Sequence, residues 1–566
     1  MMTADKILKN GYIWTAREDR DRHVETAEAI AISGDQILYV GGNDDEELKN
    51  LTGASTRIID LQGRMVIPAL IDSHIHIGST AKSSWYCILT KEEHSTKENI
   101  RKAIAKYAKE HSAKERPYIY VESCPTGIMD EPCMTKEFLD GIVSDRPLLL
   151  CDENFHRCLC NSRMLALMGI EDSSSYKANG SRNFRFDADG KPTGIVDERA
   201  FEDLLDSMYE KIGWYPPSEA DGDLMLPLLQ TLNSYGVGFV RDGFTDSEAT
   251  LEGLSVLEKE GKLTLYYEGS RYIKEISELE DAVSDVCRWQ ETYGSRLIRV
   301  NTIKLFLDGT NEIGTSAVLE PFCNDPEGKD CGTLQFSEAD LTTVLDRMND
   351  ERMDVQIHLV GDRAFRTALN AVEAARKLAA EKGHAWVSRV TLLHCELTDP
   401  SDWPRIRELG VYINWTPHWS GGCFGDASKF YLGEERFGRM YAVNSMIQAG
   451  AVVNYSSDVV DLEEEARINP WLGMQIGHTR YDASLGTGRI REPAGERLSR
   501  KDLLMGYTLY NAMCLGMEEQ LGSLEVGKSS NLCVLNKNYF EAADDEIAAI
   551  RPVYALFEGK VIMDEL

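Results

Sequence analysis

The sequence predicts an α/β protein: a (β/α)8 TIM barrel, a small β-sandwich domain built from both chain ends, and a large insertion after the first barrel strand. Three observations predict this architecture. The chain has 566 residues, which suits one large barrel with additions. Its middle alternates short apolar runs with helical stretches, and its two ends consist of short β-rich runs separated by turns.

The two chain ends share one pattern of short β-rich runs and tight turns. If the ends pair with each other, the middle of the chain must leave this domain and return to it. The middle should therefore be a closed unit whose own ends are close together. We predict one β-sandwich domain from residues 1–66 and 516–566. Its expected strands are residues 7–16, 27–32, 37–40, 57–60, 531–535, 553–557 and 560–563.

Residues 67–515 are expected to form the barrel. Their apolar runs are separated by helix-like segments such as residues 363–378, which is typical of parallel strands with helical crossovers. Because functional residues of such barrels lie at the C-terminal ends of the strands, the last residues of each run are the candidates for a site. The eight expected strands are residues 66–77, 238–242, 263–268, 302–308, 355–360, 390–395, 411–415 and 452–456.

One interval between expected strands is much longer than the others. About 150 residues separate the first barrel strand from the second, far more than a usual crossover contains. We predict that residues 80–230 form an inserted subdomain, with strands at 118–122 and 147–151 and a helix at 195–209. Because this segment leaves the C-terminal end of the first strand, it should cover the active site and shape substrate choice.

Charge and cysteine content limit the partners. Lys and Arg total 61 against 93 Asp and Glu, and the net charge of −32 would repel nucleic acids and anionic membrane surfaces. The 13 cysteines have no regular spacing, which indicates reduced thiols and a cytoplasmic protein. No apolar run approaches the roughly 18 residues of a membrane span. We therefore expect a small-molecule substrate, no nucleic acid and no membrane, and leave a homodimer open.

Two histidines one residue apart end the first expected barrel strand. Residues i and i+2 of a strand share a face, so His74 and His76 can converge on one metal ion. An isolated pair of this kind also occurs as a structural or surface feature. Here the context favours a metal, because His358, His394 and Asp458 end three further strands and would point to the same mouth. Imidazole and carboxylate ligands suit one or two divalent ions, with zinc favoured over iron, manganese or nickel.

Lys304 lies inside the apolar run 302–308, where a charged side chain needs a partner. One interpretation is an ion pair with Asp308 or Asp458. The other, which we favour, is a carbamylated lysine whose carboxylate, derived from CO2, bridges two metal ions.

With these residues in this order, the chain resembles the amidohydrolase superfamily, specifically amidohydrolase family 3, the branch that contains N-substituted formamide deformylases. The resemblance covers nearly the whole chain. It implies a metal-dependent barrel hydrolase in which His394 also stabilises the oxyanion. The motifs that carry it are Ile-Asp-Ser-His-Ile-His at 71–76, Ile-Lys-Leu-Phe-Leu-Asp-Gly at 303–309, Gln-Ile-His-Leu-Val-Gly-Asp-Arg-Ala at 356–364, Ser-Asp at 457–458 and Leu-Gly-Ser-Leu-Glu-Val-Gly-Lys at 521–528.

Four residues are candidates for substrate binding. His156 belongs to the inserted segment, where the alternative is a hydrogen-bonded structural histidine. His418 and Trp419 follow the seventh expected strand, and Asp308 ends the fourth. Each would therefore lie at or above the barrel mouth.

The predicted reaction is metal-assisted hydrolysis of a C–N bond, an amide or N-substituted formamide, in a small organic substrate. Asp458 accepts the proton of the attacking water and passes it to the departing nitrogen, because an amide nitrogen leaves poorly unless it is protonated. Two alternatives remain. A deaminase or cyclic-amide hydrolase would use the same water and the same acid and base, and a metal-binding regulatory protein would bind without turnover.

Overall fold

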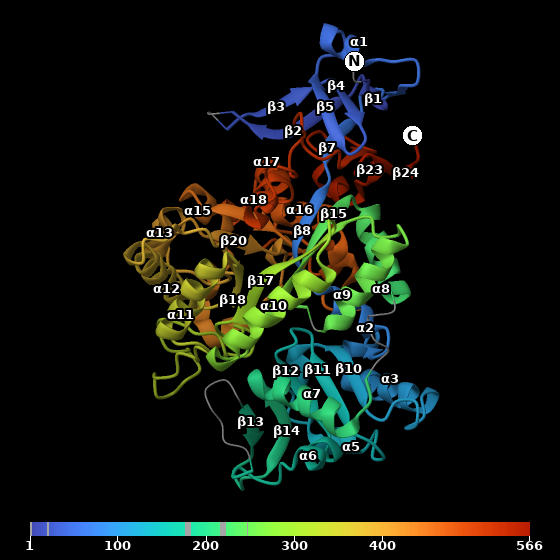
Figure 1. The fold of residues 1–566 in the computed structure, drawn as a ribbon. Coiled ribbons are helices and arrows are strands. Elements are labelled where there is room, and N and C mark those ends of the chain that lie inside the picture. Colours follow the sequence, from blue (N-terminus) through green and yellow to red (C-terminus); the bar gives the residue numbers. More distant parts are fainter. Residues whose placement is uncertain (1–2, 20–21, 176–182, 216–221, 246) are drawn as a thin grey trace.

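The chain folds into three regions stacked along one direction, which Figure 1 shows from the terminal β-structure at the top to the inserted subdomain at the bottom. The computed structural model describes residues 3–19, 22–175, 183–215, 222–245 and 247–566. Within this part of the chain, no helix is both long and apolar enough to cross a membrane.

The middle region is a barrel of eight parallel strands, and each of the eight expected runs overlaps one of them. The expected first strand, residues 66–77, is too long at both ends, because residues 66–68 belong to a strand of the terminal region and residues 76–77 lie beyond the barrel strand. The first and last strands lie side by side, where the Asp458 N–H donates to the His74 carbonyl at 2.9 Å. The predicted α/β barrel is thus confirmed. Its strands are β8 (Leu70–Ile75), β15 (Val237–Asp242), β16 (Tyr266–Tyr272), β17 (Ile298–Phe306), β18 (Asp354–Leu359), β19 (Val390–His394), β20 (Tyr412–Trp415) and β21 (Val452–Tyr455).

Helices cover the outside of the barrel. In α12 (Asp362–Glu381), Phe365, Ala368, Leu369 and Val372 recur at the spacing of one helix face, and all four are buried in the main core. This amphipathic pattern explains why the expected segment 363–378 is helical. The other helices of this region are α8 (Gly222–Ser234), α9 (Glu248–Lys259), α10 (Leu279–Tyr293), α11 (Glu338–Glu351), α13 (Trp403–Leu409), α14 (Ser428–Arg439), α15 (Val443–Gln448), α16 (Pro470–Thr479), α17 (Arg500–Gly506) and α18 (Leu509–Leu515).

Along the barrel strands, side chains that pack in the apolar core alternate with side chains that point into the barrel. In β18, Val355, Ile357 and Leu359 belong to the main apolar core, which includes residues of the surrounding helices. Gln356 and His358 lie between them in the sequence, so they point to the opposite face, into the barrel. The same period of two places functional side chains of the other strands inside the barrel.

Both chain ends build the terminal region, which contains two sheets in the orders β5-β4-β1-β6 and β24-β23-β22-β7-β2-β3. Ile30 and Ile32 of one sheet share an apolar core with Val534 and Leu556 of the other. The elements are β1 (Lys6–Lys9), β2 (Tyr12–Glu18), β3 (Val24–Ala27), β4 (Ala29–Ser33), β5 (Gln36–Gly41), α1 (Glu46–Leu51), β6 (Arg57–Asp60), β7 (Met65–Pro68), β22 (Leu532–Leu535), β23 (Pro552–Phe557) and β24 (Lys560–Asp564).

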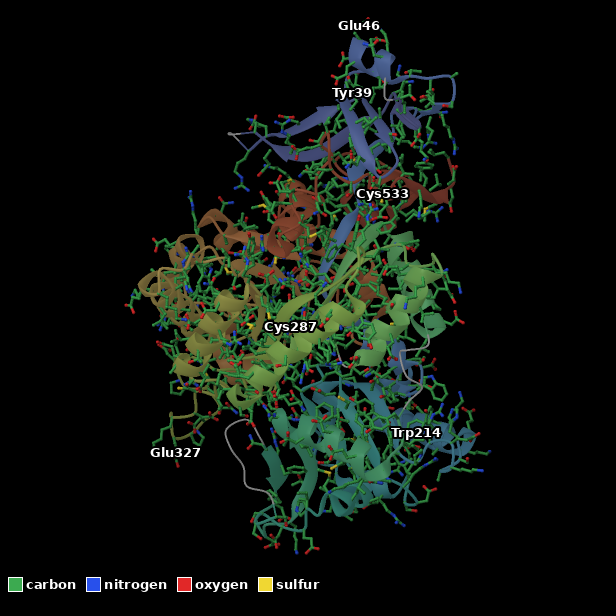
Figure 2. All side chains as sticks on the ribbon, in the orientation of Figure 1. Tyr39, Glu46, Trp214, Cys287, Glu327 and Cys533 are labelled. Atoms are coloured by element: carbon green, nitrogen blue, oxygen red, sulfur yellow. The ribbon has the colours of Figure 1, made fainter. Side chains whose placement is uncertain are left out.

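Two details of the terminal region bear on the sequence predictions. The expected strand 7–16 is in fact two strands, because Asn10 adopts a left-handed conformation with φ 58° between β1 and β2. Cys533, labelled in Figure 2, lies where this region meets the barrel, with its Sγ 3.7 Å from the Gly236 carbonyl oxygen. The domain limits 1–66 and 516–566 stay a prediction.

The inserted subdomain follows β8 and contains a six-stranded sheet in the order β13-β14-β12-β11-β10-β9. Residues 176–182 and 216–221 of the expected segment 80–230 lie outside the described residues. Its elements are α2 (Ile77–Ser83), β9 (Cys87–Ile88), α3 (Lys97–Glu110), β10 (Ile119–Cys124), α4 (Thr126–Met129), α5 (Lys136–Asp140), β11 (Leu148–Asp152), β12 (Arg157–Cys160), α6 (Ser162–Met168), β13 (Asn183–Phe186), β14 (Pro192–Asp197) and α7 (Arg199–Ile212).

The expected strands 118–122 and 147–151 coincide with β10 and β11. The expected helix 195–209 is wrong at its start, because residues 195–197 belong to β14. Glu198, with φ 53°, turns the chain from that strand into α7. The apolar run Gly194-Ile-Val fits either element by periodicity, and its pairing with β12 decides for a strand.

Candidate metal centre and substrate cavity

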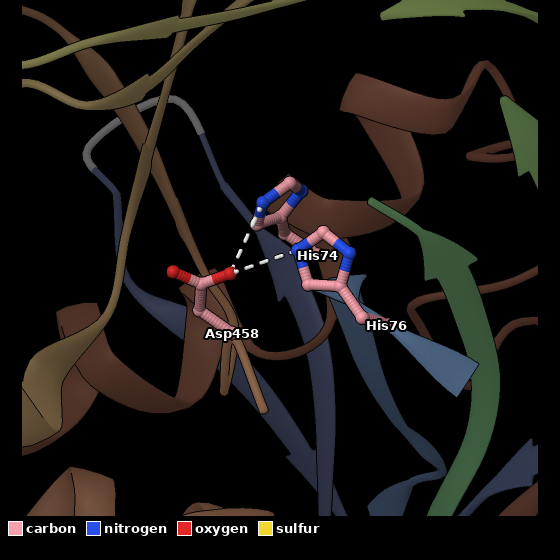
Figure 3. A group of neighbouring side chains, drawn as sticks. All are labelled: His74, His76 and Asp458. Carbon is pink, nitrogen blue, oxygen red and sulfur yellow. Dashed lines mark ion pairs between the residues drawn. The ribbon is translucent and has the colours of Figure 1, made fainter. Parts of the chain in front are cut away.

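Closure of the barrel brings His74 of β8 and His76, the residue that follows β8, against Asp458, which follows β21 (Figure 3). Asp458 Oδ1 lies 3.2 Å from His74 Nε2 and 3.3 Å from His76 Nε2. One ligand atom from each residue lies within 4.8 Å of those of the other two. Asp458 is nearly four hundred positions from the two histidines in the sequence, and the three side chains together form one compact set of nitrogen and oxygen donors.

A second carboxylate holds the two strand ends in register. Asp72 Oδ1 accepts the His74 N–H at 3.3 Å and the Ser457 N–H at 3.1 Å. Asp458 itself adopts a left-handed conformation, with φ 51°, so the chain leaves the direction of the strand beside the histidines. The position of the Asp458 carboxylate is thus fixed by backbone contacts of both neighbouring strands.

The remaining predicted ligands line the same cavity. The His394 ring lies 4.5 Å from that of His358 and 5.5 Å from that of His74, measured between ring centroids. Lys304 extends from β17, where its Nζ lies 4.7 Å from the centroid of the Phe306 ring. Within the described part of the chain, Lys304 has no ion-pair partner, so the structure does not support the ion pair with Asp308 or Asp458.

Burial decides the charge states in this cluster. It lowers the pKa of His74 to about 4, and nearby Lys304 adds to the effect, while Asp458 opposes it. Burial likewise lowers the pKa of His358 and of His394 well below the usual range. Neutral imidazoles keep a lone pair free, which is the form that binds metal ions.

The same burial acts on the two charged members. It lowers the pKa of Lys304 to about 7, against the opposing effect of Asp458. Burial alone would raise the pKa of Asp458, but the neighbouring imidazoles, His74 foremost, hold it well below its usual range. The centre therefore presents a carboxylate, the neutral imidazoles of His74, His358 and His394, and an amine that is partly unprotonated near neutral pH.

These residues fit a divalent metal ion. His76 Nδ1 and His394 Nδ1 are buried and have no hydrogen-bond partner. A buried polar atom without a partner is costly, so such atoms often mark a missing ligand or ion. Imidazole nitrogen and carboxylate oxygen are also the donors that zinc and related ions prefer.

The centre opens into a cavity of about 860 Å³ that the inserted subdomain covers. Aromatic side chains form much of its wall. Trp419 stacks on His394 with the ring centroids 5.2 Å apart and an angle of 28° between the planes. The cavity is large enough for a small organic molecule next to the histidines.

His156 reaches this cavity from the inserted subdomain, and its ring centroid lies 5.3 Å from that of His358. Its Nδ1 lies 2.9 Å from Glu198 Oε2, and Glu198 also accepts a hydrogen bond from the Thr315 hydroxyl. Burial lowers the pKa of His156, but Glu198 outweighs this effect and the pKa rises to about 9. An imidazolium therefore faces the predicted metal ligands at neutral pH.

Two of the expected substrate contacts do not face the cavity. Asp308 is fully buried, and its carboxylate accepts the backbone N–H groups of Ala317, Val360 and Gly361 at 2.8 to 2.9 Å. His418 is also buried and lies beside the Asn469 carbonyl, 3.2 Å from its Nε2. Of the four residues expected to bind substrate, His156 and Trp419 line the cavity, while Asp308 and His418 support its walls.

Several residues that line or support the cavity were not among the sequence predictions, and Gln356, Glu198 and Glu122 are examples. Gln356 contacts His74, Glu198 contacts His156, and Glu122 lines the cavity from β10. A signal existed for Gln356 and Glu122, because each stands two residues from another inward-facing side chain on its strand. For Glu198 there was no such signal, since its position depends on the turn between β14 and α7.

Comparison with known proteins gives a consistent result. A family model described as "Amidohydrolase family" matches residues 57–563. The N-substituted formamide deformylase of Arthrobacter pascens is 23% identical over 553 residues, which is 95% of this chain and 95% of that protein. The putative amidohydrolase YtcJ of Bacillus subtilis is 23% identical over 565 residues, 99% of each chain.

A solved structure agrees with these sequence matches. An uncharacterized metal-dependent hydrolase from Pyrococcus furiosus superposes with a TM-score of 0.66 and is 26% identical. The match covers 94% of this chain and 99% of that chain, so it includes the terminal region, the barrel and the inserted subdomain together.

Proposed function

The chain belongs to the amidohydrolase family, and from this premise we propose that it hydrolyses a C–N bond, an amide or an N-substituted formamide, in a small organic substrate. The observation that carries the proposal is the convergence of His74, His76 and Asp458 at the floor of a cavity that also contains His358, His394 and Lys304. The similarity to a formamide deformylase over nearly the whole chain supports the substrate class.

The proposed metal ligands are His74, His76, His358, His394 and Asp458, joined by Lys304 if its amine is carbamylated. Zinc suits these donors best, with one or two ions per chain. A bound divalent ion supplies Lewis-acid activation of water and of the substrate carbonyl.

The chain's own groups then move the protons. Asp458 Oδ2 is the carboxylate oxygen that His74 and His76 do not share, since both contact Oδ1. We assign to Oδ2 the proton of the attacking water and its transfer to the leaving nitrogen. His394, whose Nδ1 lies 3.8 Å from Oδ2, is placed to stabilise the developing oxyanion on the carbonyl.

Carbamylation of Lys304 has a chemical basis in its surroundings. An amine reacts with CO2 only when it is unprotonated, and burial lowers the pKa of Lys304 to about 7. The product is an anion, which would balance the charge of metal ions beside neutral histidines. His156 and Trp419 then border the substrate, His156 as a hydrogen-bonding group and Trp419 as an apolar face.

A substrate screen on metal-loaded protein tests the proposal. The panel contains amides, N-substituted formamides, lactams and amino-heterocycles, and mass spectrometry identifies the products. Release of formate or another carboxylate with an amine supports the proposed reaction. Ammonia release from the heterocycles would instead identify a deaminase, ring opening a cyclic-amide hydrolase, and binding without turnover across the panel a regulatory protein.

A further inference from the structure

Apart from the metal centre, the cavity has a second chemically distinct wall, which the inserted subdomain supplies. Four tyrosines and one glutamate of this subdomain line it, and none of them takes part in the proposed chemistry. We call this group the tyrosine cage. It consists of Tyr86, Tyr120, Tyr209, Tyr215 and Glu122.

Strand period explains how the cage arises from β10. Ile119 and Val121 pack into an apolar cluster that includes residues of α3, on one face of the sheet. Tyr120 and Glu122 alternate with them and therefore point to the other face, which borders the cavity. An acidic residue at this strand position is costly to bury unless something pairs with it.

The tyrosine rings contact one another around this position. The rings of Tyr86 and Tyr120 meet edge to face with their centroids 4.8 Å apart. The hydroxyl oxygens of Tyr86 and Tyr209 lie 3.3 Å apart, and the Tyr209 ring stacks on Tyr215 at 5.6 Å. Tyr215 is mostly exposed, so the cage extends from the buried sheet to the outer part of the cavity.

Glu122 is the unusual member. Its side chain is only 4% exposed, and its Oε2 has no hydrogen-bond partner. Within the described part of the chain, no cationic group lies within ion-pair distance of it. Burial and the neighbouring Asp461 raise the pKa of Glu122 well above its usual range, with Lys82 acting in the opposite direction. The carboxyl group thus lacks the cation that would stabilise its charged form.

We propose that the tyrosine cage binds an ammonium group of the substrate, with Glu122 as its counter-ion and the tyrosine rings as its walls. Faces of aromatic rings attract cations, and a cation bound beside Glu122 would stabilise the ionised form of this carboxyl group, which then supplies the opposite charge. Among the described residues, the donors that lie close enough together to hold a metal ion are those of His74, His76 and Asp458. The cage is not part of this group, so we assign its cation to the substrate rather than to a second metal centre. The substrate class becomes an amide or formamide with a cationic substituent, which rests on the proposed function.

Calorimetry with two non-reacting probes of the same shape tests binding separately from catalysis. Choline carries a trimethylammonium group, and 3,3-dimethylbutan-1-ol carries a neutral tert-butyl group in its place. We expect the metal-loaded protein to bind choline about tenfold or more tightly than the alcohol. Equal affinity for the two probes would overturn the cage.

Matched variants assign the effect to the cage. Glu122→Gln keeps the shape of the side chain and should remove most of the preference for choline. Tyr86→Leu should weaken choline binding severalfold, whereas Tyr86→Phe, which keeps the ring, should not. Glu278→Gln removes a carboxylate that lines the cavity from the barrel rather than from the inserted subdomain, and it should leave the preference unchanged. Melting temperatures of all variants establish that they are folded, and a preference retained in folded Glu122→Gln contradicts the proposal.

A pair of formamides connects the cage to the reaction. The N-substituents are 2-(trimethylammonio)ethyl and 3,3-dimethylbutyl, and the measured quantity is the ratio of their kcat/KM values. A ratio of about ten or more that falls toward one in Glu122→Gln supports the cage. Hydrolysis of both formamides at equal kcat/KM overturns the cage and keeps the proposed function. Preference for choline without hydrolysis of either formamide keeps the cage and overturns formamide hydrolysis.

Discussion

Gln356 holds His74 by its side chain: the Gln356 Oε1 lies 3.1 Å from His74 Nδ1, inside the barrel. Since an amide oxygen only accepts, Nδ1 donates and the lone pair of the neutral ring is on Nε2, the atom nearest Asp458. Gln356 is held in turn, because its Nε2 donates to the Ser270 hydroxyl at 2.7 Å. A chain of hydrogen bonds from β16 through β18 thus sets the orientation of the proposed ligand on β8.

Replacement of Gln356 by Leu should therefore weaken metal binding without removing any ligand. We expect a loss of about 10- to 100-fold in affinity, the usual effect of removing a group that orients a metal-binding histidine. Competition with a chelator of known affinity measures it. Gln356→Glu keeps an acceptor oxygen next to Nδ1 and should bind metal more tightly than the Leu variant. Wild-type affinity in Gln356→Leu would show that this contact does not orient His74.

Loss of either His74 or His76 should remove metal and activity together. His74→Ala and His76→Ala each delete one of the three donors that converge in the structure. Elemental analysis and turnover on the same preparation give the result. His23→Ala, an exposed histidine of the terminal region, is the control and should keep both. Full activity after verified removal of metal from the wild type would exclude the metal mechanism altogether.

Lys304→Ala should lose metal, and short carboxylic acids such as acetate or propionate should restore part of the activity. The acid supplies the carboxylate that the carbamate provides in the proposed centre. Mass spectrometry of the native protein under CO2 checks the modification directly. An unmodified Lys304 in metal-replete, fully active protein would show that the ions are held without this bridge.

Much of this site follows from the sequence because the barrel strands repeat a simple period. His74, His358 and His394 stand at strand ends, and the alternation of apolar and polar residues fixes the face on which each lies. The convergence of strand ends at one mouth is a property of the barrel itself. These residues could be assigned without knowing a single tertiary distance.

The orientation of side chains just beyond the strand ends could not be assigned from this alternation. Asp308 lies two residues after β17, but the following loop folds back so that the Ala317 N–H binds its carboxylate. His418 turns toward the Asn469 carbonyl at the start of α16. Asp308 also binds the N–H groups of Val360 and Gly361, and both these contacts and that of His418 join residues about fifty positions apart, which no local pattern encodes. Whether such a residue faces the cavity therefore depends on tertiary structure.

The ion pair of His156 and Glu198 should make stability depend on pH. Burial alone would lower the pKa of His156, but Glu198 raises it from 6.5 to about 9 in the folded protein. Since the folded pKa is the higher one, the stabilisation is fully present below pH 6.5 and is lost as the pH rises through 9. Its upper limit is about 3 kcal/mol.

Glu198→Gln should therefore lower the melting temperature most at pH 6 and least near pH 10. Thermal unfolding of both proteins across this range gives the difference at each pH. Glu278→Gln serves as the reference, because this variant also removes one carboxylate from the cavity wall and should shift the melting temperature by the same amount throughout. A Glu198→Gln effect that does not vary with pH would mean that His156 is not charged by this partner.

Asp458→Asn tests the acid and base role itself. The amide is nearly isosteric, and the backbone N–H of residue 458 that donates to the His74 carbonyl is unchanged, so the barrel should still close. An amide oxygen remains beside the two Nε2 atoms, and much of the metal should therefore stay bound. The amide cannot take the proton of the attacking water, so kcat should fall by about a hundredfold or more while KM changes little. If Asp458 had only a structural role after β21, activity would instead follow stability across the variants. Measurement of kcat, metal content and melting temperature on one preparation separates these cases. Near-normal kcat in metal-loaded Asp458→Asn would assign the proton transfer to another group.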